Sequence, residues 1–254
     1  TRATVAREKG LQPLADLILA QPTEGDYEAL AQPFLGEAVP TIEEAYAGAR
    51  DIVAEVVADD PKVRDPLRGL FKRRGSFSVT VLDEGKDPEG VYRLYYDFTG
   101  DLSKMRPHQI LALNRAEREE VLKITLEVPE PEALGTVAQH YPSDSASPLS
   151  DELVTAREDG YHRLLFPAVE RELRRAFTDT ADAHAIGVFA TNLKALLLLP
   201  PLRGQTVLGI DPGIRTGCKV AVVDPTGKVL ATDTIYPERS HERSMATLRE
   251  LAEK

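Results

Sequence analysis

An acidic side chain close to the end of the sequence stands where it could do chemistry. The run from Val207 to Asp224 reads VLGIDPGIRTGCKVAVVD, in which Asp211 ends a short apolar strand and enters a Pro-Gly turn. A carboxylate followed by glycines, which permit close backbone approach, suits a hard divalent cation such as magnesium. The same layout also suits phosphate contacts. The remaining alternative is a turn in which Asp211 only accepts hydrogen bonds from backbone amides.

Phosphodiester cleavage with two metal ions requires several converging carboxylates, because one aspartate cannot hold and balance both cations. The other acids nearby, Asp224 and Asp233, occupy turn or strand positions that are typical of solvated surface. Asp211 is therefore the only candidate for a catalytic residue or a metal ligand. Since it stands alone, the sequence predicts no catalytic residue, no metal site and no cofactor.

Basic side chains form two candidate contact points for nucleic acid. Four of them end a predicted helix, where cations also offset the C-terminal helix dipole, and two flank the turn after Asp211, where they could meet a phosphate. Solvated charge is the alternative at both places. The candidates are Arg68, Lys72, Arg73, Arg74, Arg215 and Lys219.

Other familiar chemistries find no support in the residue pattern. The five histidines are scattered without ligand spacing, and the single cysteine, Cys218, lies on an apolar strand and is expected to be a small core residue. Neither a phosphate-binding Gly-Lys-Ser/Thr loop nor a Gly-x-Ser-x-Gly elbow occurs. A zinc site, a disulfide and a nucleophilic enzyme are thus not expected.

Composition favours a globular cytoplasmic protein. The 254 residues carry a net charge of −10, which argues against a broad nucleic-acid surface because such binding requires clustered Lys and Arg. One cysteine fits a reducing compartment. The longest apolar run, residues 195–202, contains two prolines and is too short to span a bilayer, so no membrane partner is expected.

The elements that must position these residues follow from periodicity. Residues 1–128 are predicted to be mostly helical, with a capping box at Thr41 and Glu44. Alternation predicts a strand near 77–81 that pairs with 121–128. Between them, residues 87–98 fit a helix, which we prefer, although alternating Tyr92, Leu94 and Tyr96 would also fit a strand. Residues 107–120 are predicted to form another helix.

The residue pattern of the second half changes twice. Residues 129–148 are rich in Pro, Ser and Glu and predict a connection, which opens a stretch of connecting helices over 129–201 with two apolar stripes, one from Leu153 to Phe177 and one from Ile186 to Leu197. Residues 202–254 predict three strands and the start of a helix. The expected fold class is mainly α with a small β-hairpin element, followed by the opening strands of a ribonuclease-H-like α/β domain.

Four ordered blocks resemble one known family. The run PPLRGQTVLGIDPGIRTGCKVAVVDPTGKVLATDTIYP, residues 200–237, closely resembles the opening of the YqgF-like domain of Tex proteins, and residues 1–18, 95–124 and 161–198 resemble the preceding parts of that family in order. Departures are small: Arg115-Ala116-Glu117 stands where the family usually has Arg-Gly-Glu, and residues 79–90 lack the family's usual Lys- and Glu-rich character. The sequence begins without methionine and stops at the start of a helix, so we expect an excerpt of a longer chain.

The resemblance implies a bacterial relative of the eukaryotic Spt-type elongation factor. Residues 1–128 would hold the helix-turn-helix type N-terminal region, and residues 202–254 a truncated YqgF-like domain without a full set of catalytic acids. The resemblance implies a non-enzymatic transcription accessory factor that binds RNA, or single-stranded DNA, mostly through modules beyond residue 254. RNA polymerase or the ribosome would be further partners. The alternative is a structure-specific nuclease of the Holliday-junction-resolvase kind, with magnesium on Asp211. An ATP-binding actin-like domain would need a second glycine-rich loop, which does not occur up to residue 254.

Overall fold

Capping and helical periodicity build the first part of the chain. In the computed structural model, which describes residues 1–200, 202, 204–213 and 215–253, helices α1 (Arg2–Glu8), α2 (Gln12–Ala20) and α3 (Tyr27–Ala31) surround α4 (Ile42–Asp59). Thr41 caps the helix as predicted, since its hydroxyl accepts the Glu44 N–H at 3.2 Å, which is one of the two hydrogen bonds of the predicted capping box. The buried face of α4 comprises Ala45, Tyr46, Ala49, Ile52, Val53, Ala54, Val57 and Ala58.

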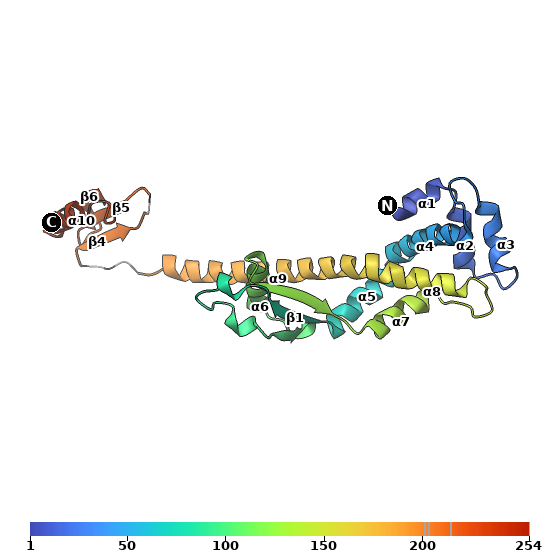
Figure 1. Ribbon diagram of the computed structural model, residues 1–254. Helices are drawn as coiled ribbons and strands as arrows, with labels where there is room; N and C mark the ends of the chain where they lie inside the picture. The colour runs from blue at the N-terminus through green and yellow to red at the C-terminus, as the bar shows by residue number, and fades with distance from the viewer. Residues whose placement is uncertain (201, 203, 214, 254) are drawn as a thin grey trace. The chain divides into compact units, whose positions relative to one another are not determined.

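A small antiparallel sheet follows the next helix. Helix α5 (Pro61–Arg74) leads into β1 (Ser76–Val81), which pairs with β2 (Thr99–Asp101) on one side and β3 (Leu122–Glu127) on the other. Residues Val79 and Ile124 lie opposite each other, so the predicted pairing of these two segments is confirmed. Helix α6 (Pro107–Arg118) precedes β3, also as predicted. This sheet and α6 lie beside the long helix α9 (Phe166–Leu197), and α5 contacts α9 near its start through Arg68 and Glu172 (Figure 1).

The helix predicted over residues 87–98 is wrong, and so is the strand considered there. The segment instead forms a loop with single 3₁₀ turns at Glu84–Lys86 and Arg93–Tyr95. The carboxylate of buried Asp87 accepts the N–H groups of Val91 (2.7 Å) and Tyr92 (2.9 Å) and the hydroxyl of Tyr96 (3.0 Å). Because the Asp87 carboxylate accepts the hydrogen bonds of these amides, the amides do not need the backbone carbonyls that would accept them in a helix. The alternation of Tyr92, Leu94 and Tyr96 that suggested a strand instead occurs in a loop, where the Tyr92 N–H and the Tyr96 hydroxyl bind one carboxylate.

This loop is expected to open in acid. Burial raises the pKa of Asp87, but the Tyr92 and Val91 amides and the Tyr96 hydroxyl outweigh burial, so its folded pKa is lowered. A lowered folded pKa means that the stabilisation is present above the unfolded value of about 3.9 and is lost as the pH falls below it. Hydrogen exchange should therefore show slow Val91 and Tyr92 amides at neutral pH in the parent chain and fast ones in Asp87→Ala. Equal protection in the two proteins would contradict the role of Asp87.

The connection predicted at residues 129–148 is partly a helix. Helix α7 (Glu130–His140) occupies its first half, because Pro129 is the N-cap residue and Pro131 lies in the first turn, where a missing N–H does no harm. Helix α8 (Ser150–Asp159) then runs through a π-helical turn (Gly160–Leu165) into α9 (Phe166–Leu197). The first predicted apolar stripe is largely buried, with Leu153, Tyr161, Leu165 and Leu173 all inside.

Contacts divide the chain into two units, Thr1–Val188 and Phe189–Lys254. The predicted division at residues 128 and 201 stays a prediction, and Pro201 lies outside the described residues. The second predicted stripe, from Ile186 to Leu197, is exposed among the described residues, with Phe189 at 66% and Leu196 at 65%. No helix in the described part of the chain is long and apolar enough to cross a membrane.

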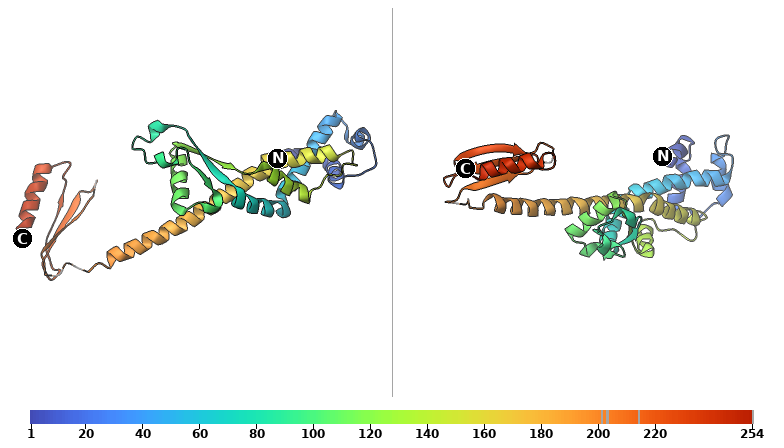
Figure 2. Two further views of the ribbon diagram at one scale, coloured as in Figure 1. Left: turned by 90° about the horizontal axis from the view of Figure 1, so that it is seen from below. Right: turned by 60° about the vertical axis from the view of Figure 1, so that its left-hand side comes forward.

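The second unit contains the predicted three strands and helix. Strands β4 (Val207–Asp211), β5 (Cys218–Val223) and β6 (Val229–Ile235) form an antiparallel sheet in the order β4-β5-β6, and α10 (His241–Ala252) follows. Figure 2 shows α10 along one face of this sheet, where Leu251 packs with Val220, Val222 and Ile235. The overall class is therefore the expected one: mainly helical, then the opening strands of a ribonuclease-H-like domain.

Candidate functional site

Asp211 ends strand β4 at the surface of the second unit. It lies opposite Lys219 of β5, which lies opposite Thr234 of β6, and directly paired residues point to the same face of a sheet. Gly209 and Ala221 form the next pair on this face. Because both side chains are small, no bulky group covers the sheet beside Asp211. A depression of about 680 Å³ includes Asp211, Lys219 and Thr234 in its lining. Asp211 and Lys219 offer one carboxylate and one ammonium group on this face, and Asp233 also contributes to the lining.

Two glycines shape the turn after Asp211. A Cβ on Gly213 would lie 2.4 Å from the carbonyl oxygen of Gly217, and a Cβ on Gly217 would lie 2.6 Å from the Tyr236 ring. Gly217 also has φ of +83°, a conformation that side chains rarely adopt. Neither position therefore has room for a side chain, and Ile214 between them lies outside the described residues.

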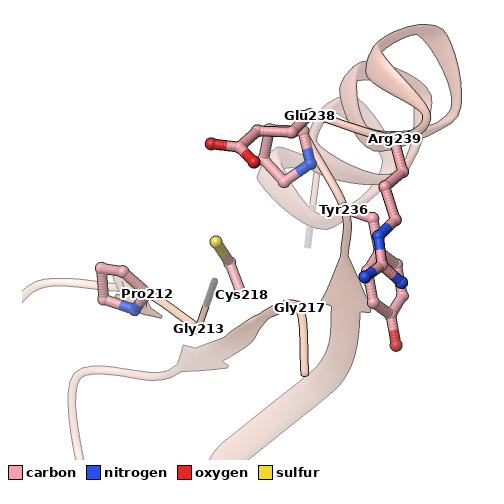
Figure 3. A pocket seen from close by; sticks show the side chains of 8 residues that line it. Pro212, Gly213, Gly217, Cys218, Tyr236, Glu238 and Arg239 are labelled. Carbon is pink, nitrogen blue, oxygen red and sulfur yellow. The ribbon is translucent and has the colours of Figure 1, made fainter. Parts of the chain in front are cut away.

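A small pocket adjoins this turn on the side of Tyr236. It has a volume of about 200 Å³ and lies between Pro212, Cys218 and the segment from Tyr236 to Arg239 (Figure 3). The Cys218 side chain is half-buried and also packs against the core of the second unit, in agreement with its predicted role. Sequence reasoning missed the contribution of the Tyr236–Arg239 segment. Its only signal was Pro237 after a strand, which indicates a turn but not a pocket.

The three acids near the turn diverge. Asp233 lies opposite Val220, the neighbour of Lys219, and successive residues of a strand point to opposite faces, so Asp211 and Asp233 occupy different faces of the sheet. Asp224 follows the far end of β5. In the described part of the chain, no group of three His, Cys, Asp or Glu side chains is placed to hold a metal ion. The described acids therefore do not converge on one point.

Asp224 has a structural role instead. Its Oδ1 accepts the Thr226 N–H at 2.8 Å, the Thr226 hydroxyl at 2.6 Å and the Lys228 N–H at 3.0 Å. The Thr226 hydroxyl, followed by these backbone donors, lowers the pKa of Asp224. The carboxylate therefore holds the β5–β6 hairpin turn, as is common for aspartate in turns.

The candidate cations of α5 differ in their freedom to bind a ligand. Arg68 donates to Glu172 of α9 at 2.7 Å and to Asp65 at 2.8 Å, and Arg74 donates to Glu132 at 3.0 Å. Hydrogen bonding to Glu172 raises the pKa of Arg68, and the same bond lowers the pKa of Glu172. Half of these charges are thus already neutralised by carboxylates.

The other four candidates are exposed and have no ion pair among the residues that the structure describes. They are Lys72, Arg73, Arg215 and Lys219. The first two belong to the first unit and the last two to the second. Their contact with nucleic acid stays a prediction.

Comparison with known proteins gives the class to which this arrangement belongs. Residues 23–189 match the family model described as Tex central region-like, and residues 205–254 match the Tex protein YqgF-like domain. A helical region followed by the opening of a YqgF-like domain, which is the order of the two units, is therefore the arrangement of a Tex-type protein.

The relatives are more specific. The chain is 39% identical to protein tex of Bordetella pertussis and 36% identical to transcriptional accessory protein Tex of Neisseria gonorrhoeae, over 99% of this chain in both cases. It is also 31% identical, over 93% of its length, to the human S1 RNA-binding domain-containing protein 1. The chain belongs to the Tex family. It spans about a third of the two bacterial relatives (34% each) and a quarter of the human one.

Proposed function

We propose that the chain is part of a cytoplasmic transcription accessory factor that associates with RNA or single-stranded DNA, and that this portion serves mainly as a scaffold. The observation that carries the proposal is the match along 99% of the chain to a protein named transcriptional accessory protein Tex. The human relative's name adds an S1 RNA-binding domain to that family context. Contacts with RNA polymerase or the ribosome belong to the same proposal.

The charges of the chain support a scaffold role more than a role in tight binding of nucleic acid. The net charge is −10, and Arg68 and Arg74 are held by carboxylates of the same chain. Each phosphate contact requires a cation that is free to displace a counterion. Of the six candidate cations, Lys72, Arg73, Arg215 and Lys219 have no ion pair in the described part of the chain, two in each unit.

The 254-residue chain is therefore expected to bind nucleic acid weakly and with little dependence on base sequence. Fluorescence anisotropy with a labelled 20-nucleotide single-stranded RNA should give a dissociation constant above about 1 µM at about 150 mM salt. Full-length protein should bind more tightly and lose that advantage when the region after residue 254 is deleted. Submicromolar binding by the 254-residue chain would show that the scaffold assignment is wrong.

A structure-specific nuclease is the second candidate function, and one observation favours it. Asp211 stands exposed at the end of β4, next to a tight turn in which Gly213 and Gly217 leave no room for a side chain. The divergence of Asp224 and Asp233 means that further acids would have to come from elsewhere in the protein. Two or three acids at strand and helix ends after residue 254 would support this function, and their absence would argue against it.

A further inference from the structure

The first unit has a pocket whose apolar lining neither the sequence motifs nor the proposed function uses, although Arg68 and Lys72 at its edge are among the candidate nucleic-acid contacts. It lies between α5, the start of α6 with Met105 before it, and α9, and has a volume of about 320 Å³. Its walls come from three segments that are far apart in sequence. The lining residues are Arg68, Lys72, Met105, Pro107, Ile110, Leu173, Ala176, Phe177, Thr180 and Ala181.

The floor of this pocket is apolar and belongs to the main core. Ile110 and Leu173 are each 4% exposed and Ala181 is 1% exposed, while Met105 and Phe177 pack partly buried beside them. Because these residues are held by the core, the floor exists before any ligand arrives. The volume accommodates one or two large aliphatic or aromatic side chains, which is the usual way that apolar pockets anchor a partner.

The rim of the pocket is basic. Arg68 and Lys72 come from successive turns of α5, and none of the ten lining residues is acidic. The nearby carboxylates of Glu172 and Asp65 are already bonded to Arg68, and Glu172 also pairs with Arg64. Lys72 has no ion pair in the described part of the chain. The rim therefore presents an uncompensated ammonium group directly above an apolar floor.

We propose that this pocket is a docking site for an acidic peptide segment of a partner protein, with an apolar side chain in the pocket and a neighbouring carboxylate on Lys72. Charge complementarity selects this occupant, because the rim is positive while the chain as a whole is negative. A nucleic acid would use the cations but leave the aliphatic floor empty, since Phe177 is the only aromatic residue of the lining and is partly buried.

A peptide titration tests the proposal. The probe is a fluorescein-labelled dodecapeptide with a central Leu-Phe pair flanked by glutamates, and its counterpart has lysine in place of every glutamate. Anisotropy with the 254-residue chain should show binding of the acidic probe alone. Lys72→Glu should weaken binding at least about tenfold, because it turns attraction into repulsion. Ala176→Trp should weaken binding similarly by filling the pocket, and Ala176 is exposed, so the fold tolerates the larger ring.

A matched control and a competing ligand decide the result. Lys62→Glu changes an exposed lysine of the same helix that does not line the pocket, so it should leave binding unchanged. Equal loss in Lys62→Glu, or equal binding of the basic probe, would overturn the proposal. So would a single-stranded RNA 20-mer that binds in a Lys72-dependent manner while Ala176→Trp has no effect, because the surface would then contact phosphate only.

Discussion

Replacing Glu152 by alanine is expected to lower the free energy of unfolding by about 3 kcal/mol, the amount typical of breaking a buried charge pair. The Glu152 side chain is 9% exposed and accepts hydrogen bonds from Arg50 and from the Tyr27 hydroxyl, each at 2.8 Å. The Tyr27 ring stacks on Tyr46 with ring centroids 4.3 Å apart. One carboxylate thereby joins α3, α4 and α8, and its loss leaves the Tyr27 hydroxyl without its acceptor and the partly buried Arg50 guanidinium with Glu43 alone.

The control for this prediction uses the same arginine. Arg50 also pairs with Glu43 at 2.9 Å, but the Glu43 side chain is 73% exposed. An exposed pair contributes little, so Glu43→Ala should change stability by less than about 1 kcal/mol. Urea unfolding followed by far-UV circular dichroism measures both variants, and tyrosine fluorescence provides a second probe because the chain has no tryptophan. Similar losses in the two variants would show that burial of Glu152 is not the cause.

Valine at Gly160 is expected to destabilise the first unit by about 2 to 3 kcal/mol through overpacking. Gly160 begins the π-helical turn between α8 and α9, and a Cβ there would lie 3.0 Å from the Ala54 carbonyl oxygen and 3.2 Å from the Ala54 Cα. These are backbone atoms of α4, so the side chain fits only if one helix moves away from the other. The absence of a side chain therefore sets how closely α4 packs on this turn.

Gly135 supplies the opposite expectation. It lies within α7, and a Cβ there would meet nothing within 4 Å. Gly135→Ala should stabilise the protein by up to about 1 kcal/mol, because alanine has the higher helix propensity. Thermal or urea unfolding of Gly160→Val and Gly135→Ala should move in opposite directions. A Gly160→Val protein as stable as the parent chain would contradict the close packing of α4.

Local sequence patterns predicted those elements of the fold in which a side chain acts on its own strand, turn or helix end. Alternation predicted the pairing of β1 with β3 because Phe77 and Val79 bury one face of a two-faced ribbon. The cap at Thr41 and the hairpin at Pro225–Gly227 followed from residues whose local hydrogen bonds or conformations are nearly fixed. By contrast, Asp87 binds groups four, five and nine residues ahead, and no periodic pattern reveals such a carboxylate-centred loop.

The candidate site was predictable only in part, for a similar reason. The position of Asp211 at a strand end follows from the apolar run before it. Whether Asp233 shares its face depends on strand register, since a shift of one residue reverses every side chain. Likewise, the four cations that end α5 look equivalent in sequence. The structure separates Lys72 and Arg73 from Arg68 and Arg74 only because Glu172 and Glu132, about 100 and 60 residues away in sequence, come close enough to bond the latter pair.

Two statements are central: the full-length protein associates with nucleic acid, and Asp211 is not a catalytic residue. The most direct measurement incubates full-length protein with a labelled four-way DNA junction and a labelled single-stranded RNA, with and without magnesium, and resolves products on a denaturing gel alongside binding by anisotropy. We predict that the RNA is bound, that both substrates remain uncut, and that Asp211→Asn leaves binding unchanged. Magnesium-dependent cutting of the junction that disappears in Asp211→Asn would contradict the account.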